Sequence, residues 1–199
     1  MKGKKIIAGL LVLVSAWLMA GCGRIPSAAE PWREAYAAFL REPENYAEES
    51  HYAGSFALAD LNNDGKPEMI LVYYNGNEGG AIFANIYAYD GEVRRIGHQV
   101  DMWYKTCFLS TNPSFPGVFV EGGRNSTFSC SYWTVKDNVF VDEPLWSNIA
   151  DVDTQDMVYK ELSGNQQLIA EAKKITSSVS NEIEFFEIDE AHIRAEENF

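Results

Sequence analysis

The chain has 199 residues, of which 46% are hydrophobic and 13% aromatic, which is enough for one globular core and too apolar for a disordered chain. Its 29 Asp and Glu against 16 Lys and Arg give a net charge of −13, which argues against nucleic acid or another polyanion as a partner. Three Cys are too few for a small fold held together by disulfides.

The first 21 residues have the pattern of an export signal. Three lysines among the first five residues precede the apolar run Ile6–Ala20, which is short for a membrane-spanning helix and typical of a signal peptide. We therefore expect residues 1–21 to be removed and to contribute nothing to the fold.

The end of this segment, Leu18-Met19-Ala20-Gly21-Cys22, resembles the lipobox of bacterial lipoproteins, with Met19 where Leu is usual. The resemblance implies cleavage after Gly21, lipid on Cys22, and an extracytoplasmic protein held on the cell membrane by its acyl chains. Residues 22–30 would then be a short tether, and residues 31–199 would be a single domain.

After residue 30 the sequence shows segments with the apolar spacing of helices and segments with that of strands. Pro31 opens a segment with Trp32, Tyr36, Phe39 and Leu40 on one helical face. In chain order we expect a helix at 31–42; strands at 55–59, 68–75, 81–89, 92–100, 102–109, 117–121, 126–136 and 138–142; a helix at 164–176; a strand at 182–188; and a short helix capped near Asp189.

Turn and cap signals support these boundaries. Asp90-Gly91 and Asp137-Asn138 predict tight hairpin turns, and Ser163 with Gln166 resembles a capping box. The predicted fold class is α+β, with an antiparallel β-meander sheet, one N-terminal helix and two C-terminal helices.

One loop predicts a metal site. Counted from Asp60 as position 1, side-chain oxygens fall at positions 1, 3, 5 and 9 in Asp60, Asn62, Asp64 and Glu68. Gly65 stands at position 6, where a metal loop turns sharply, and the Lys66 carbonyl is a further candidate ligand. This donor set suits Ca²⁺, whereas the alternative is a polar β-turn with solvated acids.

This stretch resembles the calcium loops of FG-GAP and VCBS-type repeats and, more distantly, those of EF-hands. It departs from an EF-hand because Pro67 replaces an apolar residue and Leu71 replaces the bidentate acid. The resemblance implies a structural Ca²⁺ site with a Kd on the order of 10⁻⁴–10⁻³ M. A single loop in a chain of this length excludes a complete propeller.

Enzyme signatures are weak. His51, His98 and His192 are scattered and form no metal or nucleophile motif, so we expect surface or packing roles for them. A pair of acids such as Glu121 with Asp101 would be needed for a carboxylate-dependent hydrolase, which is the less favoured alternative.

The middle strands carry aromatic residues and two cysteines. Trp103 and Trp133 either pack in the core or belong to an exposed row that stacks on a cell-wall glycan or a protein partner. Cys107 and Cys130 either form a disulfide or remain two separate buried thiols. The function predicted from these features is a membrane-anchored, calcium-stabilised surface binding module with no assigned chemistry.

Overall fold

The computed structural model describes residues 30–75, 81–102, 108–112, 115–124, 127–150, 157–175 and 183–197. Residues Pro31–Phe199 form one compact unit, separate from Met1–Glu30. Its elements, in chain order, are α1 (Pro31–Arg41), the 3₁₀ helix η1 (Pro43–Asn45), β1 (Tyr52–Ala59), β2 (Glu68–Tyr74), β3 (Ala81–Tyr89), β4 (Val93–Asp101), β5 (Phe108–Asn112), β6 (Phe115–Arg124), β7 (Thr127–Lys136), β8 (Val139–Ala150), β9 (Met157–Glu161), α2 (Gln166–Ile175), β10 (Phe186–Glu187) and α3 (Glu190–Glu197).

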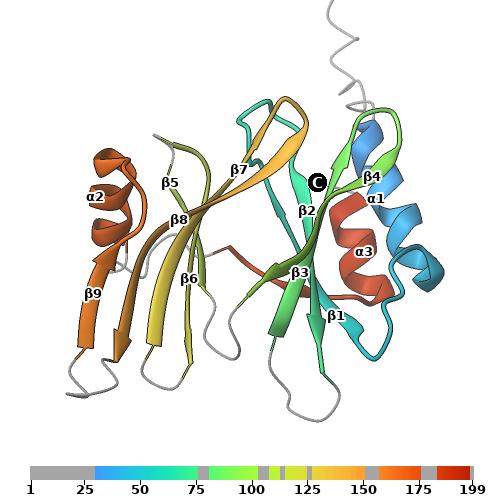
Figure 1. Cartoon of the computed structure of the whole chain (residues 1–199). Helices are drawn as coiled ribbons and strands as arrows, with labels where there is room; N and C mark the ends of the chain where they lie inside the picture. Colours follow the sequence, from blue (N-terminus) through green and yellow to red (C-terminus); the bar gives the residue numbers. More distant parts are fainter. Residues whose placement is uncertain are drawn as a thin grey trace, which may run out of the picture. The chain divides into compact units, whose positions relative to one another are not determined.

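The predicted α+β class is confirmed, and the strands pair antiparallel throughout the described part of the chain. The meander is divided into two five-stranded sheets (Figure 1). Sheet 1 has the order β10-β1-β2-β3-β4, and sheet 2 has the order β5-β6-β7-β8-β9. Each sheet follows the chain from strand to neighbouring strand, except that β10 returns from the C-terminal region to pair with β1.

The two sheets share one hydrophobic core. A single cluster of buried residues includes Ile70 and Val72 from sheet 1 together with Val118 and Trp133 from sheet 2. The Phe140 side chain of β8 approaches the backbone of Gly97 in β4, where an added Cβ would lie 3.1 Å from the Phe140 ring. The inner faces of the sheets are therefore packed against each other.

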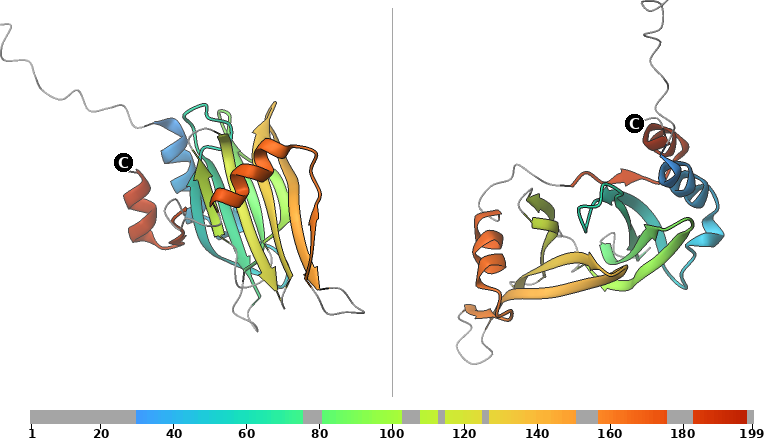
Figure 2. Two further views of the ribbon diagram at one scale, coloured as in Figure 1. Left: turned by 90° about the vertical axis from the view of Figure 1, so that its left-hand side faces the viewer. Right: turned by 90° about the horizontal axis from the view of Figure 1, so that it is seen from above.

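Helices pack on the outer face of each sheet. Trp32 and Tyr36 of α1 and Ile193 of α3 pack against sheet 1 in a second cluster. Leu168 and Ile169 of α2 pack against sheet 2 in a third. The views in Figure 2 show α1 and α3 side by side and α2 alone beside sheet 2. Helices thus lie outside both sheets, and the largest core lies between them.

The sequence of β2 explains its central place in sheet 1. Met69, Leu71 and Tyr73 pack in the cluster under α1 and α3, while Ile70 and Val72 pack in the core between the sheets. Apolar residues at both parities are the pattern of a strand buried on both faces, as the sequence predicts.

Local signals predict some boundaries better than others. Asp137 and Asn138 have φ of 53° and 60°, which makes the predicted hairpin turn between β7 and β8. The α2 cap differs from prediction: the Asn165 carboxamide, and not Ser163, accepts the backbone N–H of Leu168, at 3.2 Å. The Ser163 hydroxyl instead accepts the backbone N–H of Asn165, two residues later and before the helix begins, at 2.9 Å.

Strand lengths also differ from prediction. Strand β5 begins at Phe108, so the strand predicted at 102–109 overlaps it by only two residues, and most of that prediction lies outside the described residues. Strand β8 runs on to Ala150, and β9 was not predicted. The predicted last strand is reduced to the two residues of β10 within the described chain.

Candidate calcium loop and aromatic residues

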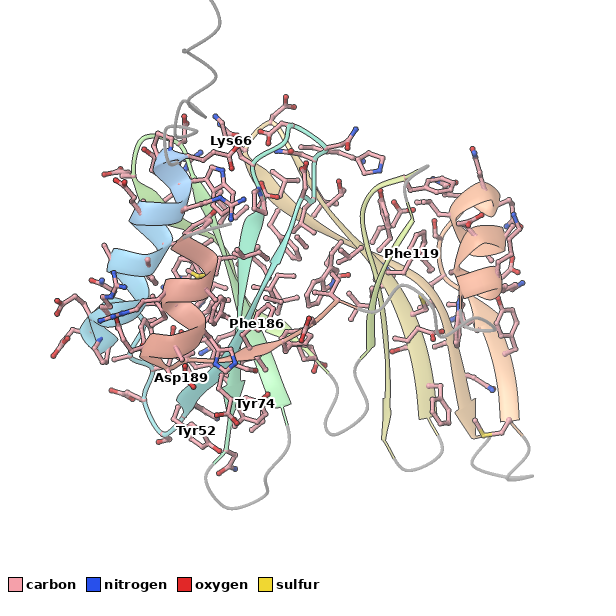
Figure 3. The ribbon with its side chains drawn as sticks, turned by 180° about the vertical axis from the view of Figure 1, so that it is seen from behind. Tyr52, Lys66, Tyr74, Phe119, Phe186 and Asp189 are labelled. Carbon is pink, nitrogen blue, oxygen red and sulfur yellow. The ribbon has the colours of Figure 1, made fainter. Side chains whose placement is uncertain are left out.

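The candidate metal loop connects β1 to β2 in sheet 1, a strand-loop-strand arrangement. Two residues of the loop have positive φ, Asn63 at 61° and Gly65 at 84°. Glycine adopts this left-handed backbone without steric cost, which explains its place at the sharpest point of the turn. Figure 3 shows Lys66 on the loop at one end of sheet 1, with Tyr52 and Tyr74 at the opposite end.

Carboxylates hold the loop in this shape. The Asp60 side chain accepts the backbone N–H groups of Asp64, at 3.1 Å, and of Gly65, at 2.8 Å. The Asp64 carboxylate in turn accepts the N–H of Lys66 at 2.8 Å. The acids at positions 1 and 5 therefore lie inside the curve of the loop, facing backbone donors.

Glu68 is the buried acid of the group. Its side chain accepts the N–H of Leu61 at 2.8 Å, and the residue is only 4% exposed. Burial raises the pKa of Glu68 to about 7, and the charges of Asp64 and Asp60 raise it further, while the Leu61 N–H lowers it. A cation at this place would relieve both the burial cost and the repulsion.

Asn62 joins the two later acids. Its Nδ2 donates to Asp64 at 3.2 Å and lies 3.4 Å from Glu68, while its Oδ1 accepts the Asp64 N–H at 2.9 Å. No ion pair with Lys or Arg reaches Asp60, Asp64 or Glu68 within the described part of the chain. Three acids thus share one loop with only N–H dipoles to balance them.

The loop also joins the two sheets. Leu61 is fully buried, and its carbonyl accepts the Thr134 hydroxyl at 2.8 Å and the Val135 N–H at 3.3 Å, both on β7 of sheet 2. From α1, the Tyr36 hydroxyl donates to the Pro67 carbonyl at 3.0 Å. Burial, followed by the Glu68 charge, raises the pKa of Tyr36.

The chemical type of the donor groups in the loop suits a hard cation. Carboxylate and amide oxygens are the ligands that Ca²⁺ prefers, and each carboxylate oxygen can accept more than one contact. Within the described residues, however, no three His, Cys, Asp or Glu side chains converge in the manner of a formed metal site. One oxygen of the Asp64 carboxylate already accepts the Lys66 N–H. Calcium binding at this loop therefore stays a prediction.

The predicted aromatic pair has a different outcome. Trp133 is 1% exposed and packs edge-on against Phe140 in the core between the sheets, so of the two alternatives for this residue the structure has core packing, and the alternative of an exposed stacking row does not hold for Trp133. Its parity on β7 points it toward the interior of the two sheets. Trp103 lies outside the described residues.

The exposed aromatic residues lie elsewhere. Tyr52 is 53% exposed, Phe128 is 51% exposed and Tyr159 is 44% exposed. Sequence reasoning missed Phe128 and Tyr159 because their exposure depends on which half of sheet 2 is covered by α2. No local pattern around either residue carries that information.

The predicted cysteine sites are only partly described. Cys22 and Cys107 lie outside the described residues. Cys130 is buried and lies directly opposite Glu121 of β6, which in turn lies opposite Phe108 of β5. Strand β6 therefore lies between the strand of Cys130 and the strand that follows Cys107, and the disulfide stays a prediction.

The acids proposed for a hydrolase are not brought together. Glu121 lies opposite Cys130, whose side chain packs in the cluster under α2. Asp101 is the last residue of β4 in sheet 1, where it lies opposite Phe83. The two acids therefore stand on different sheets, with Glu121 on the face of sheet 2 that packs against α2, which corrects the Glu121 and Asp101 pairing.

The histidines have packing and surface roles. The ring of His51 contacts Phe83 at 5.1 Å between centroids. His98 lies 3.6 Å from Glu48, and His192 lies 2.9 Å from Asp189. Asp189 also accepts the His192 N–H at 2.9 Å, and so it caps α3 as the sequence predicts.

Comparison with protein-family models, with curated proteins and with solved structures gave no match. Among the described residues, no helix has both the length and the apolar character needed to cross a bilayer.

Proposed function

We propose that this chain is an exported lipoprotein, anchored to the bacterial cell membrane through Cys22, whose domain is a surface binding module stabilised by Ca²⁺ at the loop from Asp60 to Glu68. The observation that carries the calcium part is the place of Leu61. The residue accepts two hydrogen bonds from β7 of the other sheet, and its own N–H is held by Glu68. A cation that fixes the loop also fixes the junction of the two sheets.

The residues that would hold the ion are Asp60, Asn62, Asp64 and Glu68, with the Lys66 carbonyl as a further donor. Bound Ca²⁺ would supply positive charge next to three carboxylates, one of them buried. Its role would be structural. Mg²⁺ is the matched test ion because it demands a tighter octahedral shell than a loop of this kind offers.

The calcium proposal is tested by thermal unfolding of the full chain in millimolar Ca²⁺, in Mg²⁺ and in EDTA. At a tenfold excess of Ca²⁺ over Kd, linkage raises the free energy of unfolding by about 1.4 kcal/mol. We expect this rise with Ca²⁺ alone, and we expect Asp64→Ala to abolish it. Asp90→Ala is the control, because Asp90 is an exposed acid in a different turn, between β3 and β4. An equal Ca²⁺ response in both variants would contradict the proposal.

The anchor is tested separately by fractionating cells that express the full chain. Wild type should sediment with membranes and incorporate labelled palmitate, and Cys22→Ser should lose the label and leave the membrane fraction, because its acyl chains are the expected anchor. Retention of Cys22→Ser in the membrane would contradict lipid anchoring and leave the calcium proposal intact.

A further inference from the structure

Helix α2 covers only part of the outer face of sheet 2. It packs on Phe119, Cys130 and Leu145 through Leu168, Ile169 and Ala172. In the left view of Figure 2, α2 crosses the sheet, and the strands continue beyond it with no other helix of the described residues in front of them. The outer face of sheet 2 therefore has a covered part and an uncovered part.

A row of side chains crosses this face beside α2, with the half-exposed Phe128 and Tyr159 at its ends. Phe128 of β7 lies directly opposite Asn148 of β8, which lies directly opposite Tyr159 of β9. Directly opposite residues point to the same face of a sheet, and two strand spacings place the two aromatic residues about 10 Å apart. Trp146, two residues from Asn148, contacts the Tyr159 ring at 5.9 Å. We call Phe128, Trp146, Asn148 and Tyr159 the aromatic strip.

The strip contains two polar atoms without partners. Nε1 of Trp146 and Oδ1 of Asn148 are buried, and the described structure gives neither a hydrogen bond. A buried donor and acceptor left unpaired are unfavourable for the fold. The neighbouring Phe128 and Tyr159 side chains are about half exposed, and surface side chains change rotamer within nanoseconds. For a ligand to reach Nε1 of Trp146, the Tyr159 ring that contacts Trp146 would have to rotate away.

The charges around the strip favour an uncharged ligand. Nζ of Lys173 lies 4.8 Å from the centre of the Tyr159 ring and also pairs with Glu161 at 3.0 Å. This pair is neutral as a whole. The net charge of −13 repels a second copy of the chain and an anionic lipid surface.

We propose that the aromatic strip binds an uncharged linear glycan, an inference that rests on the proposed role as a surface binding module and gives that module its ligand. The C–H faces of two pyranose rings would stack on Phe128 and Tyr159, whose spacing of about 10 Å is roughly two sugar lengths and so suits two sugars with one sugar between them. Ring hydroxyls would accept the Trp146 N–H and donate to the Asn148 carbonyl. A purely apolar partner would leave these two polar atoms unsatisfied.

The test is isothermal titration of the full chain, in a detergent without a sugar headgroup, with cellotetraose and with chitotetraose. Wild type should bind one of them, and Phe128→Ala and Tyr159→Ala should each weaken binding about tenfold, since each removes one stacking surface. The control is Tyr52→Ala, which removes an exposed tyrosine of sheet 1 and should bind as wild type. The tryptophan fluorescence of the chain should change on binding in wild type and in Tyr52→Ala, and Trp146→Phe should remove most of that change.

Two results would overturn the inference. One is the absence of binding to either oligosaccharide at millimolar concentration by wild type that melts normally. The other is self-association of the chain that Phe128→Ala abolishes, which would assign the strip to a second copy. The Ca²⁺ response of Tyr159→Ala, measured in parallel, should equal that of wild type, so failure of glycan binding is distinguishable from failure of the calcium proposal.

Discussion

The candidate calcium loop of sheet 1 and the aromatic strip of sheet 2 present opposite relations between sequence and structure. The loop is contiguous in sequence, and its acids accept backbone hydrogen bonds from within a few residues. The strip is assembled from three strands and leaves two buried polar atoms without partners in the described structure. Short-range chemistry can be predicted from residue spacing, whereas a surface depends on strand register and on what covers it.

The largest expected effect tests whether the loop joins the sheets. Leu61→Ala removes a fully buried side chain and should lower the free energy of unfolding by about 3 kcal/mol, measured by urea denaturation. Leu162→Ala is the matched control, because Leu162 is 47% exposed and should change stability by less than about 0.5 kcal/mol. Similar values for the two variants would mean that the loop does not support the core.

A smaller effect isolates the hydrogen bond between the sheets. Thr134→Val keeps the size of the side chain and removes the hydroxyl that donates to Leu61, while the Val135 N–H still reaches the same carbonyl. We expect a loss of about 1 kcal/mol in the free energy of unfolding. Thr134→Ser retains the hydroxyl and should recover most of the loss. If Thr134→Val is as stable as wild type, the hydrogen bond from Thr134 to Leu61 does not stabilise the junction of the sheets.

In sheet 2, the titration of Glu121 on β6 should make the free energy of unfolding depend on pH by an amount similar to the Thr134 effect. Burial raises the pKa of Glu121 to about 7 in the folded state. Because the pKa is raised, Glu121 holds its proton more tightly in the folded state than in the unfolded state. Protonated Glu121 therefore contributes to the free energy of unfolding below pH 4.5, and this contribution is lost as pH rises through 7.

Because glutamine does not titrate, Glu121→Gln should remove this pH-dependent loss of the free energy of unfolding. With allowance for partial exposure, we expect the variant to exceed wild type by about 1 kcal/mol at pH 8 and to match it at pH 4, in urea denaturation at each pH. A constant difference between variant and wild type across this range would show that Glu121 does not titrate as the structure indicates.

The fold could be predicted as far as local signals extend. Pro31 at the start of α1 and the turn at Asp137-Asn138 mark true boundaries because each fixes the backbone by itself. The division of the meander into two sheets follows from long-range packing, such as the contact of Gly97 with Phe140, and no residue near the division signals it. The same limit explains Trp133, whose strand is predictable and whose buried face is not.

The candidate sites divide in the same way. Spacing alone places Asp60, Asp64 and Glu68 in one loop, but the contact of Leu61 with β7 could not be predicted because it joins residues 73 positions apart. Phe128 and Tyr159 each stand in unremarkable sequence. Their common row depends on the register of β8 between their two strands.

The most direct test of the central claim is amide hydrogen exchange at Val135, whose N–H donates to Leu61 across the sheets. If Ca²⁺ fixes the loop and thereby the junction, exchange at Val135 should slow about tenfold in Ca²⁺ relative to EDTA, and Asp64→Ala should show no change. An unchanged exchange rate at Val135, with or without slowing inside the loop itself, would contradict the claim that calcium stabilises the junction of the two sheets.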